Sequence, residues 1–431
     1  MNIELAYKKK SARLKYLIIL YLTANPIFFW VGRELRLVQE SFWQVAATML
    51  IMAGYAFFGH KPARFNRLST WICIFGLYSC VLFLLGGMRL GSVTMLNTFL
   101  GILVYLLALR LDKKDTSAIL TAIVIVGCVN TLYMALQILN FDFIFNLKGP
   151  GNLILRNISD PFGFMGIKCA MGIYKGLSMM AALFFSPFWA LLFLAPIAMS
   201  ESTAAWLAAG TGLAFYWYWM KRRLFRLIII PLVIVGFCYT VFYDMPKGMF
   251  GTRPPLWKMA LKDTVYGFNL HNDLLQPVFL RNPLTGFGLD AFYNGSIRYF
   301  TDSQTYEITR TIRIKDHYID SESGVELKRN SKGDLLTMKG NPADGWAEIH
   351  CEPIQIFYDM GLIGLVIVGF GLWEMKQRFS RAIKTKEFIV VTAMLLVFFI
   401  SSLTQFPLRM ARISSFFPIL LGLFVVNSAE G

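Results

Sequence analysis

RLDKKDTSAILTAIVIVGCVNTLYMALQIL, residues 110–139, decides the fold class, because its charged beginning is followed at 118–139 by a stretch without any charged residue. About 20 apolar residues in helical conformation are needed to cross the hydrocarbon core of a bilayer. The whole chain has this character, since 56% of its 431 residues are hydrophobic and only 16% are charged. The sequence therefore predicts an all-α polytopic membrane protein.

Similar apolar stretches recur along the chain, and we expect about twelve transmembrane helices. They lie at 16–32, 43–59, 68–88, 91–109, 118–139, 169–185, 187–200, 203–220, 227–243, 350–373, 388–404 and 412–427. The pair within 169–200 leaves two alternatives, because Ser186-Pro187 either divides two short helices or kinks one. The distribution of charge favours two helices, since one helix fewer would invert everything that precedes it.

The basic residues predict the orientation of these helices. The net charge of +16 raises the question of nucleic-acid binding. However, the lysines and arginines fall mainly in short segments between apolar stretches, where they act as cytoplasmic topology signals, and we expect no nucleic-acid partner. The cytoplasmic segments are then Lys8-Lys9-Lys10, HKPARFNR (60–67), RLDKKDTS (110–117), KRRLFR (221–226) and EMKQRFSRAIKTKE (374–387).

This orientation divides the chain into three parts. Residues 1–243 hold nine transmembrane helices with short loops and one external loop at 140–168, and residues 350–431 hold the last three. Between helices nine and ten lies an external segment, 244–349, which is far longer than an ordinary connection. Its short alternating stretches, separated by SESG and SKGD, predict hairpins and thus a small, partly β cap.

The cysteines and carboxylates indicate neither disulfides nor a metal site. Five of the six cysteines lie in or beside apolar stretches, and no CxxC pair occurs. No cluster of external carboxylates has the spacing of metal ligands. We therefore expect no metal and no cofactor.

Two arginines stand in predicted external segments beside membrane helices. Arg156 lies in NLKGPGNLILRNISDPFGF (146–164), and Arg253 lies in GTRPPLWKMALKD (251–263). Each is either a snorkelling anchor at the membrane surface or part of a clamp for diphosphate. The second alternative rests on the guanidinium group, which stays charged and offers forked donors that match phosphate oxygens.

A histidine stands where GWAEIHCEPIQIFYDMGLIG (345–364) passes from an external loop into an apolar helix. His350 is either an interfacial imidazole bonded to a backbone carbonyl or a general base, because imidazole changes charge near neutral pH. The N-terminus of the following helix offers backbone N–H groups that favour an anion. The second reading places a base and an anion site together at the membrane surface.

In chain order, GTRPPLWKMAL, RNPLTGFGLDAF (281–292) and WAEIHCEPIQIFYDMGLIGL resemble the O-antigen ligase and polymerase superfamily. Its members carry an external Arg-then-Trp segment, an NPLxGxG turn, and a histidine followed by a helix that ends in GxxG. His350, Gly361 and Gly364 match the last motif, although Cys351 stands where ligases have Asn, Ser or Gln. Arg156 maps to the arginine of an earlier external loop.

The resemblance implies an enzyme that moves a glycan from undecaprenyl diphosphate to lipid A–core or a similar acceptor. The reaction would take place at the periplasmic face of the bacterial inner membrane without nucleotide sugar, metal or other cofactor. By this resemblance, His350, oriented by Glu348, would take the proton of the acceptor hydroxyl. Arg253 and Arg156 would stabilise the departing lipid diphosphate, and the anomeric centre would be inverted.

Other functions remain open at this point. A polymerase of the same superfamily would use a second lipid-linked glycan as acceptor, and a glycan-to-protein transferase would use a protein. A twelve-helix transporter is the alternative from another class, since secondary transporters have broken helices and charges near the bilayer midplane. No similarity between two halves is visible here, and the candidate polar residues gather outside the membrane.

Overall fold

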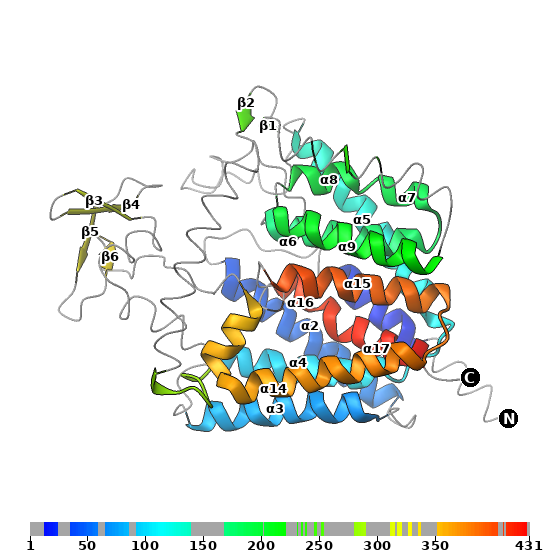
Figure 1. The fold of residues 1–431 in the computed structure, drawn as a ribbon, viewed down its shortest axis with the longest axis horizontal. Coiled ribbons are helices and arrows are strands. Elements are labelled where there is room, and N and C mark those ends of the chain that lie inside the picture. Colours follow the sequence, from blue (N-terminus) through cyan, green and yellow to red (C-terminus); the bar gives the residue numbers. More distant parts are fainter. Residues whose placement is uncertain are drawn as a thin grey trace.

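The computed structural model describes a helical body and several short strands (Figure 1). The described residues are 13–24, 35–58, 65–85, 92–138, 168–200, 202–220, 231, 234–235, 238, 245–247, 251–253, 280–289, 311–314, 317–320, 326–329, 335–337, 351–403, 408 and 411–428. The predicted boundaries at 243/244 and 349/350 lie outside them, as does most of the predicted helix 227–243.

Apolar helices form the body, because only a helix or a closed barrel pairs every backbone group within a bilayer. Residues 13–24 are helical, and the further helices are α2 (Leu35–Phe58), α3 (Arg67–Leu85), α4 (Ser92–Ala108), α5 (Asp115–Ile138), α6 (Lys168–Leu183), α7 (Pro187–Leu191), α8 (Leu194–Met199), α9 (Thr203–Met220), α14 (Glu352–Arg381), α15 (Lys386–Ser402), α16 (Ala411–Ser414) and α17 (Phe416–Ser428).

Three of the described helices are long and apolar enough to cross a membrane: Arg67–Leu85, Asp115–Gln137 and Glu352–Arg381. Several shorter apolar helices accompany them within the described part of the chain. The body is therefore all-helical and has the character of a membrane protein.

The centre of the body is α15, which packs against α6 and α9 on one side and α17 on the other (Figure 1). Its side chains from Phe388 to Val391 are completely buried. Small residues permit close approach of the helices. A Cβ atom at Gly212 of α9 would lie 2.9 Å from both Met180 and Val397, so α6, α9 and α15 meet there.

The chain reverses direction at Ser186-Pro187. Ser186 caps α7, since its hydroxyl accepts a hydrogen bond from the backbone N–H of Phe188, and Pro187 stands in the first turn. Both α7 and α8 pack back against α6. The structure thus has separate helices on the two sides of this dipeptide, as the charge pattern favours, although the returning chain is itself broken between α7 and α8.

Helix α14 corrects one boundary of the sequence analysis. We expected the apolar helix to end at about 373 and a cytoplasmic loop to occupy 374–387, but α14 continues to Arg381. The residues EMKQRFSR are good helix formers and extend the helix beyond its apolar part. Only the segment from Ala382 to Thr385 joins α14 to α15.

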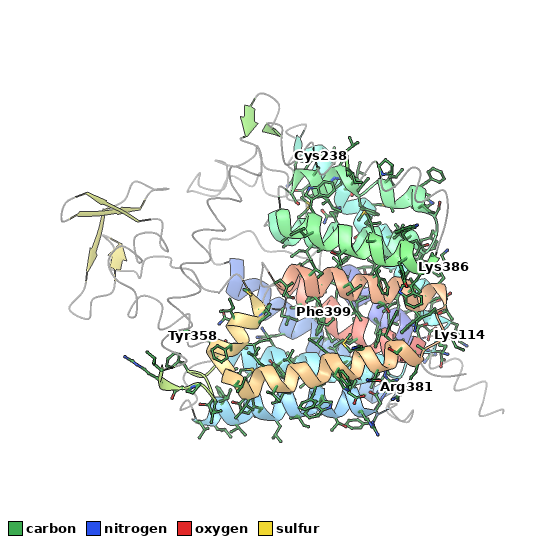
Figure 2. The ribbon with its side chains drawn as sticks, in the orientation of Figure 1. Lys114, Cys238, Tyr358, Arg381, Lys386 and Phe399 are labelled. Atoms are coloured by element: carbon green, nitrogen blue, oxygen red, sulfur yellow. The ribbon has the colours of Figure 1, made fainter. Side chains whose placement is uncertain are left out.

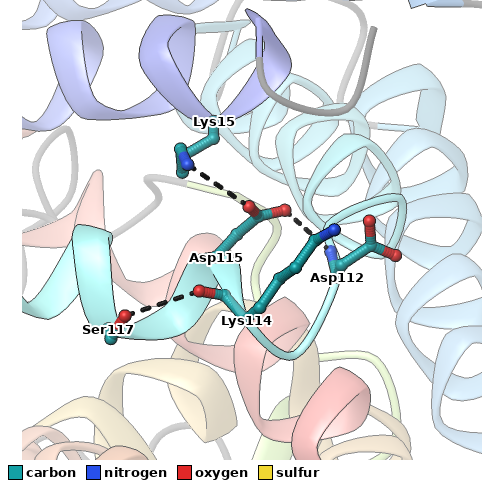
Figure 3. A network of polar contacts seen from close by, with 5 residues as sticks. All are labelled: Lys15, Asp112, Lys114, Asp115 and Ser117. Carbon is teal, nitrogen blue, oxygen red and sulfur yellow. Dashed lines mark hydrogen bonds and ion pairs between the residues drawn. The ribbon is translucent and has the colours of Figure 1, made fainter. Parts of the chain in front are cut away.

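A network of polar contacts joins helices at one end of the bundle (Figure 3). Lys15 Nζ lies 3.6 Å from Asp115 Oδ1, while Asp115 Oδ2 accepts a 3.0 Å hydrogen bond from the backbone N–H of Asp112. Nearby, Asn427 Nδ2 donates to Thr116 Oγ1 at 2.9 Å. These contacts join the helix at 13–24, the start of α5 and the end of α17.

Basic residues of two predicted cytoplasmic segments, 110–117 and 374–387, lie near this same end. Figure 2 shows Lys114, Arg381 and Lys386 near one end of the bundle, whereas Tyr358 lies toward the opposite end. Among the described residues, these two segments are thus on one side, as the predicted orientation expects.

The strands occupy the segment predicted as a partly β cap. β1 (Met245–Lys247) pairs antiparallel with β2 (Gly251–Arg253). A four-stranded antiparallel sheet follows the chain order, with β3 (Thr311–Ile314), β4 (His317–Asp320), β5 (Glu326–Arg329) and β6 (Leu335–Thr337). SESG falls between β4 and β5, and SKGD between β5 and β6, where the hairpin turns were expected.

Candidate functional site

Helix α14 is broken at Gly361, which has φ +65° and ψ −162°. The first half-helix, residues 352–360, begins after the N-cap residue Cys351, which directly follows His350 in the chain. His350 itself lies outside the described residues, so its place beside the first half-helix is known from the sequence alone.

A loop from a distant part of the sequence occupies the break. This docked loop, residues 280–289, contains the NPLTGFG motif. Backbone hydrogen bonds join it to α14 in both directions: Phe287 N–H donates to Tyr358 O at 2.9 Å, Gly288 N–H to Asp359 O at 2.9 Å, Leu362 N–H to Pro283 O at 2.9 Å, and Ile363 N–H to Leu284 O at 3.1 Å. The groups that a broken helix frees are thus paired with the loop, as a low-dielectric environment demands.

Two glycines make this contact possible. A Cβ atom at Gly286 would lie 2.6 Å from the carbonyl oxygen of Tyr358, and one at Gly361 would lie 2.3 Å from the carbonyl oxygen of Leu284. Both glycines have positive φ, +67° and +65°, which L-residues rarely adopt. The glycines of the NPLxGxG and GxxG motifs are therefore two sides of one backbone contact.

Side chains of α3 and the docked loop surround the break. The hydroxyl of Tyr78 on α3 donates a 3.0 Å hydrogen bond to the carbonyl of Met360. The rings of Phe287 and Tyr358 lie 5.2 Å apart between centroids. Leu82, Leu289 and Met360 form a small buried cluster of their own. The end of the first half-helix is thus held from two directions.

Three buried polar side chains follow one face of the first half-helix. Glu352, Gln355 and Asp359 are 4%, 1% and 1% exposed, and their spacing places them on the same side. Glu352 Oε1 accepts a 2.9 Å hydrogen bond from the backbone N–H of Leu408. Gln355 Nε2 donates to Asp359 Oδ2 at 3.0 Å. The i, i+3, i+7 spacing of these polar residues in an apolar helix is a signal that the sequence carries.

The predicted site residues fall largely outside this description. His350, Glu348 and Arg156 lie outside the described residues. The backbone of Arg253 ends β2, where it pairs with Met245. The structure thus defines the helix that follows His350 and the loop that holds this helix, while the grouping of the four residues stays a prediction.

Cys351 is the described side chain nearest to His350 in the chain. It is buried, with 9% of its surface exposed. Burial raises the pKa of the Cys351 thiol above its ordinary value, because a thiolate is poorly solvated there. The residue that departs from the ligase pattern is therefore a protonated, enclosed thiol at neutral pH.

A second polar site, which the sequence analysis overlooked, lies inside the bundle. Lys175 on α6 is fully buried, and its Nζ donates 2.8 Å hydrogen bonds to Gly127 O and Thr131 Oγ1 on α5. The ring of Phe193 lies 5.7 Å from this nitrogen. The visible signal was a single lysine within the apolar stretch 169–185.

Among the described residues, no group of three or more His, Cys, Asp or Glu side chains could hold a metal ion. Comparison of the chain with family models and with curated proteins finds no match. The residues, the motifs and the geometry around the break are therefore the features that bear on function.

Proposed function

We propose that this protein is an O-antigen ligase-like glycosyltransferase. It takes a glycan from undecaprenyl diphosphate and transfers it to lipid A–core or a similar acceptor. In this proposal the protein crosses the bacterial inner membrane with about twelve transmembrane helices, and the site and the 244–349 cap lie on the periplasmic side. The observation that carries the proposal is the docking of the NPLTGFG loop into the break at Gly361 of α14, the helix that follows His350 in the chain.

The proposed reaction needs one base and a cationic clamp. The acceptor hydroxyl attacks the anomeric carbon, its proton passes to the imidazole of His350, and the bond from that carbon to the diphosphate oxygen breaks. Glu348 orients the imidazole. Arg253 and Arg156 stabilise the negative charge that develops on the departing lipid diphosphate. Attack opposite the leaving group inverts the anomeric centre, as expected for a mechanism without a carboxylate nucleophile.

The distribution of basic residues supports this orientation. Lys114, Arg381 and Lys386 lie near one end of the bundle and Tyr358 lies toward the other (Figure 2). With the basic end in the cytoplasm, the start of α14 faces the periplasm. A lipid-linked glycan exposed on that face would meet His350 at the membrane surface.

A polymerase is the nearest alternative, and Cys351 is the observation that favours it. Ligases of the family have a polar amide or hydroxyl residue at this place, whereas here a buried thiol follows His350. A polymerase performs the same chemistry on a second lipid-linked glycan. The acceptor therefore distinguishes the two functions.

A transporter is the alternative from another class, favoured by the broken helix and by the buried Lys175. In secondary transporters, the backbone groups freed by a helix break bind the ion or substrate. Here the carbonyls of Tyr358, Asp359 and Met360 accept hydrogen bonds from the docked loop and Tyr78. Groups engaged in this way favour an architectural break over a transport site.

The proposal is tested by glycan transfer with purified protein. The donor is a synthetic lipid-diphosphate oligosaccharide, offered with lipid A–core or a second lipid-linked glycan, and EDTA is present throughout. We expect transfer to lipid A–core with release of lipid diphosphate, and a large loss in Arg253→Ala. Transfer only to the lipid-linked glycan would identify a polymerase, and no transfer to either acceptor would contradict the proposal.

A further inference from the structure

We propose that Tyr78 is a positioning residue for the glycan transfer, because its hydroxyl holds the end of the first half-helix whose other end follows His350. The inference rests on the proposed function and deepens it. Tyr78 belongs to α3, far from the sequence motifs, and touches the reaction only through the backbone of α14.

Because α14 is broken at Gly361, a small tilt there displaces the far end of the first half-helix by a larger amount. At about 1.5 Å per residue, the first half-helix is about 13 Å long. A tilt of about 10° at Gly361 would therefore move the N-terminal end of the half-helix, at Cys351, by about 2 Å. A displacement of about 1 Å in a reacting group is enough to cost roughly 100-fold in rate. A small tilt at the break would thus cause a large displacement at the end of the half-helix that follows the proposed base.

Tyr78 contacts the first half-helix beside the point about which this half-helix would tilt. Its hydroxyl donates to the carbonyl of Met360, the last residue before the break. In a bilayer, the loss of a donor to a carbonyl is unfavourable, so the half-helix would shift to find another partner. The docked loop pairs with the preceding carbonyls of Tyr358 and Asp359, whereas Tyr78 pairs with that of Met360.

Removal of this hydroxyl leaves the surrounding packing in place. The ring of Tyr78 packs against the cluster of Leu82, Leu289 and Met360. Tyr78→Phe retains the ring and deletes only the donor. A change in this variant therefore reports on the hydrogen bond to Met360 rather than on a cavity.

Tyr216→Phe is a matched control. The hydroxyl of Tyr216 on α9 also donates to a helix-end carbonyl, that of Leu183 at the end of α6, at 3.1 Å. This hydrogen bond lies in a different helix pair. Loss of a tyrosine hydroxyl that donates to a helix carbonyl is therefore common to both variants, while the contact with α14 is affected in only one.

The test combines two measurements on full-length wild type, Tyr78→Phe and Tyr216→Phe in detergent. The first is the alkylation rate of Cys351, followed by peptide-resolved mass spectrometry, which needs no activity. The second is glycan transfer at varied donor concentration. For Tyr78→Phe we expect Cys351 to react at least about threefold faster, and kcat to fall about tenfold with KM within about twofold of wild type. Tyr216→Phe should resemble wild type in both.

Each result has a defined meaning. Unchanged alkylation of Cys351 in Tyr78→Phe, or equal acceleration in Tyr216→Phe, would overturn the inference. Faster alkylation with unchanged kcat would overturn the positioning role, since the reaction would tolerate the shifted half-helix. If wild type transfers no glycan while Cys351 is still alkylated faster in Tyr78→Phe, the proposed function is wrong. The conclusion that Tyr78 positions the half-helix would then still hold.

Discussion

At the residue scale, Gly286 and Gly288 in the docked loop illustrate two different reasons why a position requires glycine. Both have positive φ, +67° and +100°. A Cβ atom at Gly286 would collide with the backbone of α14, whereas one at Gly288 would have no atom within 4 Å. Gly286 is thus required by contact as well as by conformation, and Gly288, the second glycine of the motif, by conformation alone.

This difference gives a matched prediction. Gly288→Ala should cost only the strain of a positive φ, about 1–2 kcal/mol. Gly286→Ala adds a clash between two backbones, for which a further 1–3 kcal/mol or more is about right. Thermal unfolding in detergent should therefore show a clearly larger loss for Gly286→Ala. Equal losses would mean that the docked loop does not touch α14.

Cys351 provides a prediction about pH at the same scale. The thiolate is the form that reacts with iodoacetamide, and burial raises the pKa of this thiol above its ordinary value. A raised pKa leaves less thiolate at any given pH. The alkylation rate of Cys351 in the folded protein should therefore keep rising to a higher pH than the rate in the SDS-unfolded chain does. A plateau at lower pH in the folded protein would contradict the burial.

At the element scale, the sequence analysis anticipated α14 only in part. The apolar stretch 350–373 and the Gly361–Gly364 spacing predicted a helix that follows His350. The sequence alone could not show that Gly361 breaks the helix, because the partner of the break lies about seventy residues earlier in the chain and only tertiary contact pairs them. Glycine is tolerated in membrane helices, so its presence did not mark the break.

Lys175 joins α5 and α6, and this contact also gives a prediction. Thr131→Val removes an acceptor while the amine stays buried, which should cost about 1–3 kcal/mol. Lys175→Met removes the polar group itself and retains the length of the side chain. Such replacements of buried charged groups are often nearly neutral, within about 1 kcal/mol.

Unfolding followed by tryptophan fluorescence should thus rank Thr131→Val as less stable than Lys175→Met. The reverse order would mean that the amine contributes more to the body than its two hydrogen bonds indicate, and would make Lys175 a stronger functional candidate.

At the scale of the whole molecule, hydropathy and charge anticipated the general architecture. The helical body and the gathering of Lys114, Arg381 and Lys386 near one end follow from local composition. The packing of α7 and α8 on α6 and the central place of α15 do not follow from composition. A pattern of apolar residues shows that a helix is buried but not which helices it packs against. Of the site, the sequence yielded the motifs but not their contact, and the grouping of His350, Arg253 and Arg156 stays a prediction.

The orientation of the body can be measured with single cysteine substitutions. Lys114 and Arg281 are both exposed, the first at the basic end and the second in the docked loop. In intact spheroplasts, a membrane-impermeant maleimide should label Arg281→Cys above the wild-type background and label Lys114→Cys only after permeabilisation. Labelling of Lys114→Cys in intact spheroplasts would mean that the orientation is the reverse of the proposed one. His350 would then not lie on the periplasmic face.

The central claim is that His350 is the base of a lipid-linked glycan transfer, and the most direct test compares two histidine variants. His317 belongs to β4 of the four-stranded sheet and serves as the matched control. With saturating donor and acceptor, His350→Ala should lose at least about 100-fold in kcat, the low end of general-base catalysis, while His317→Ala should retain most of the wild-type rate. Transfer that persists in His350→Ala would contradict the account.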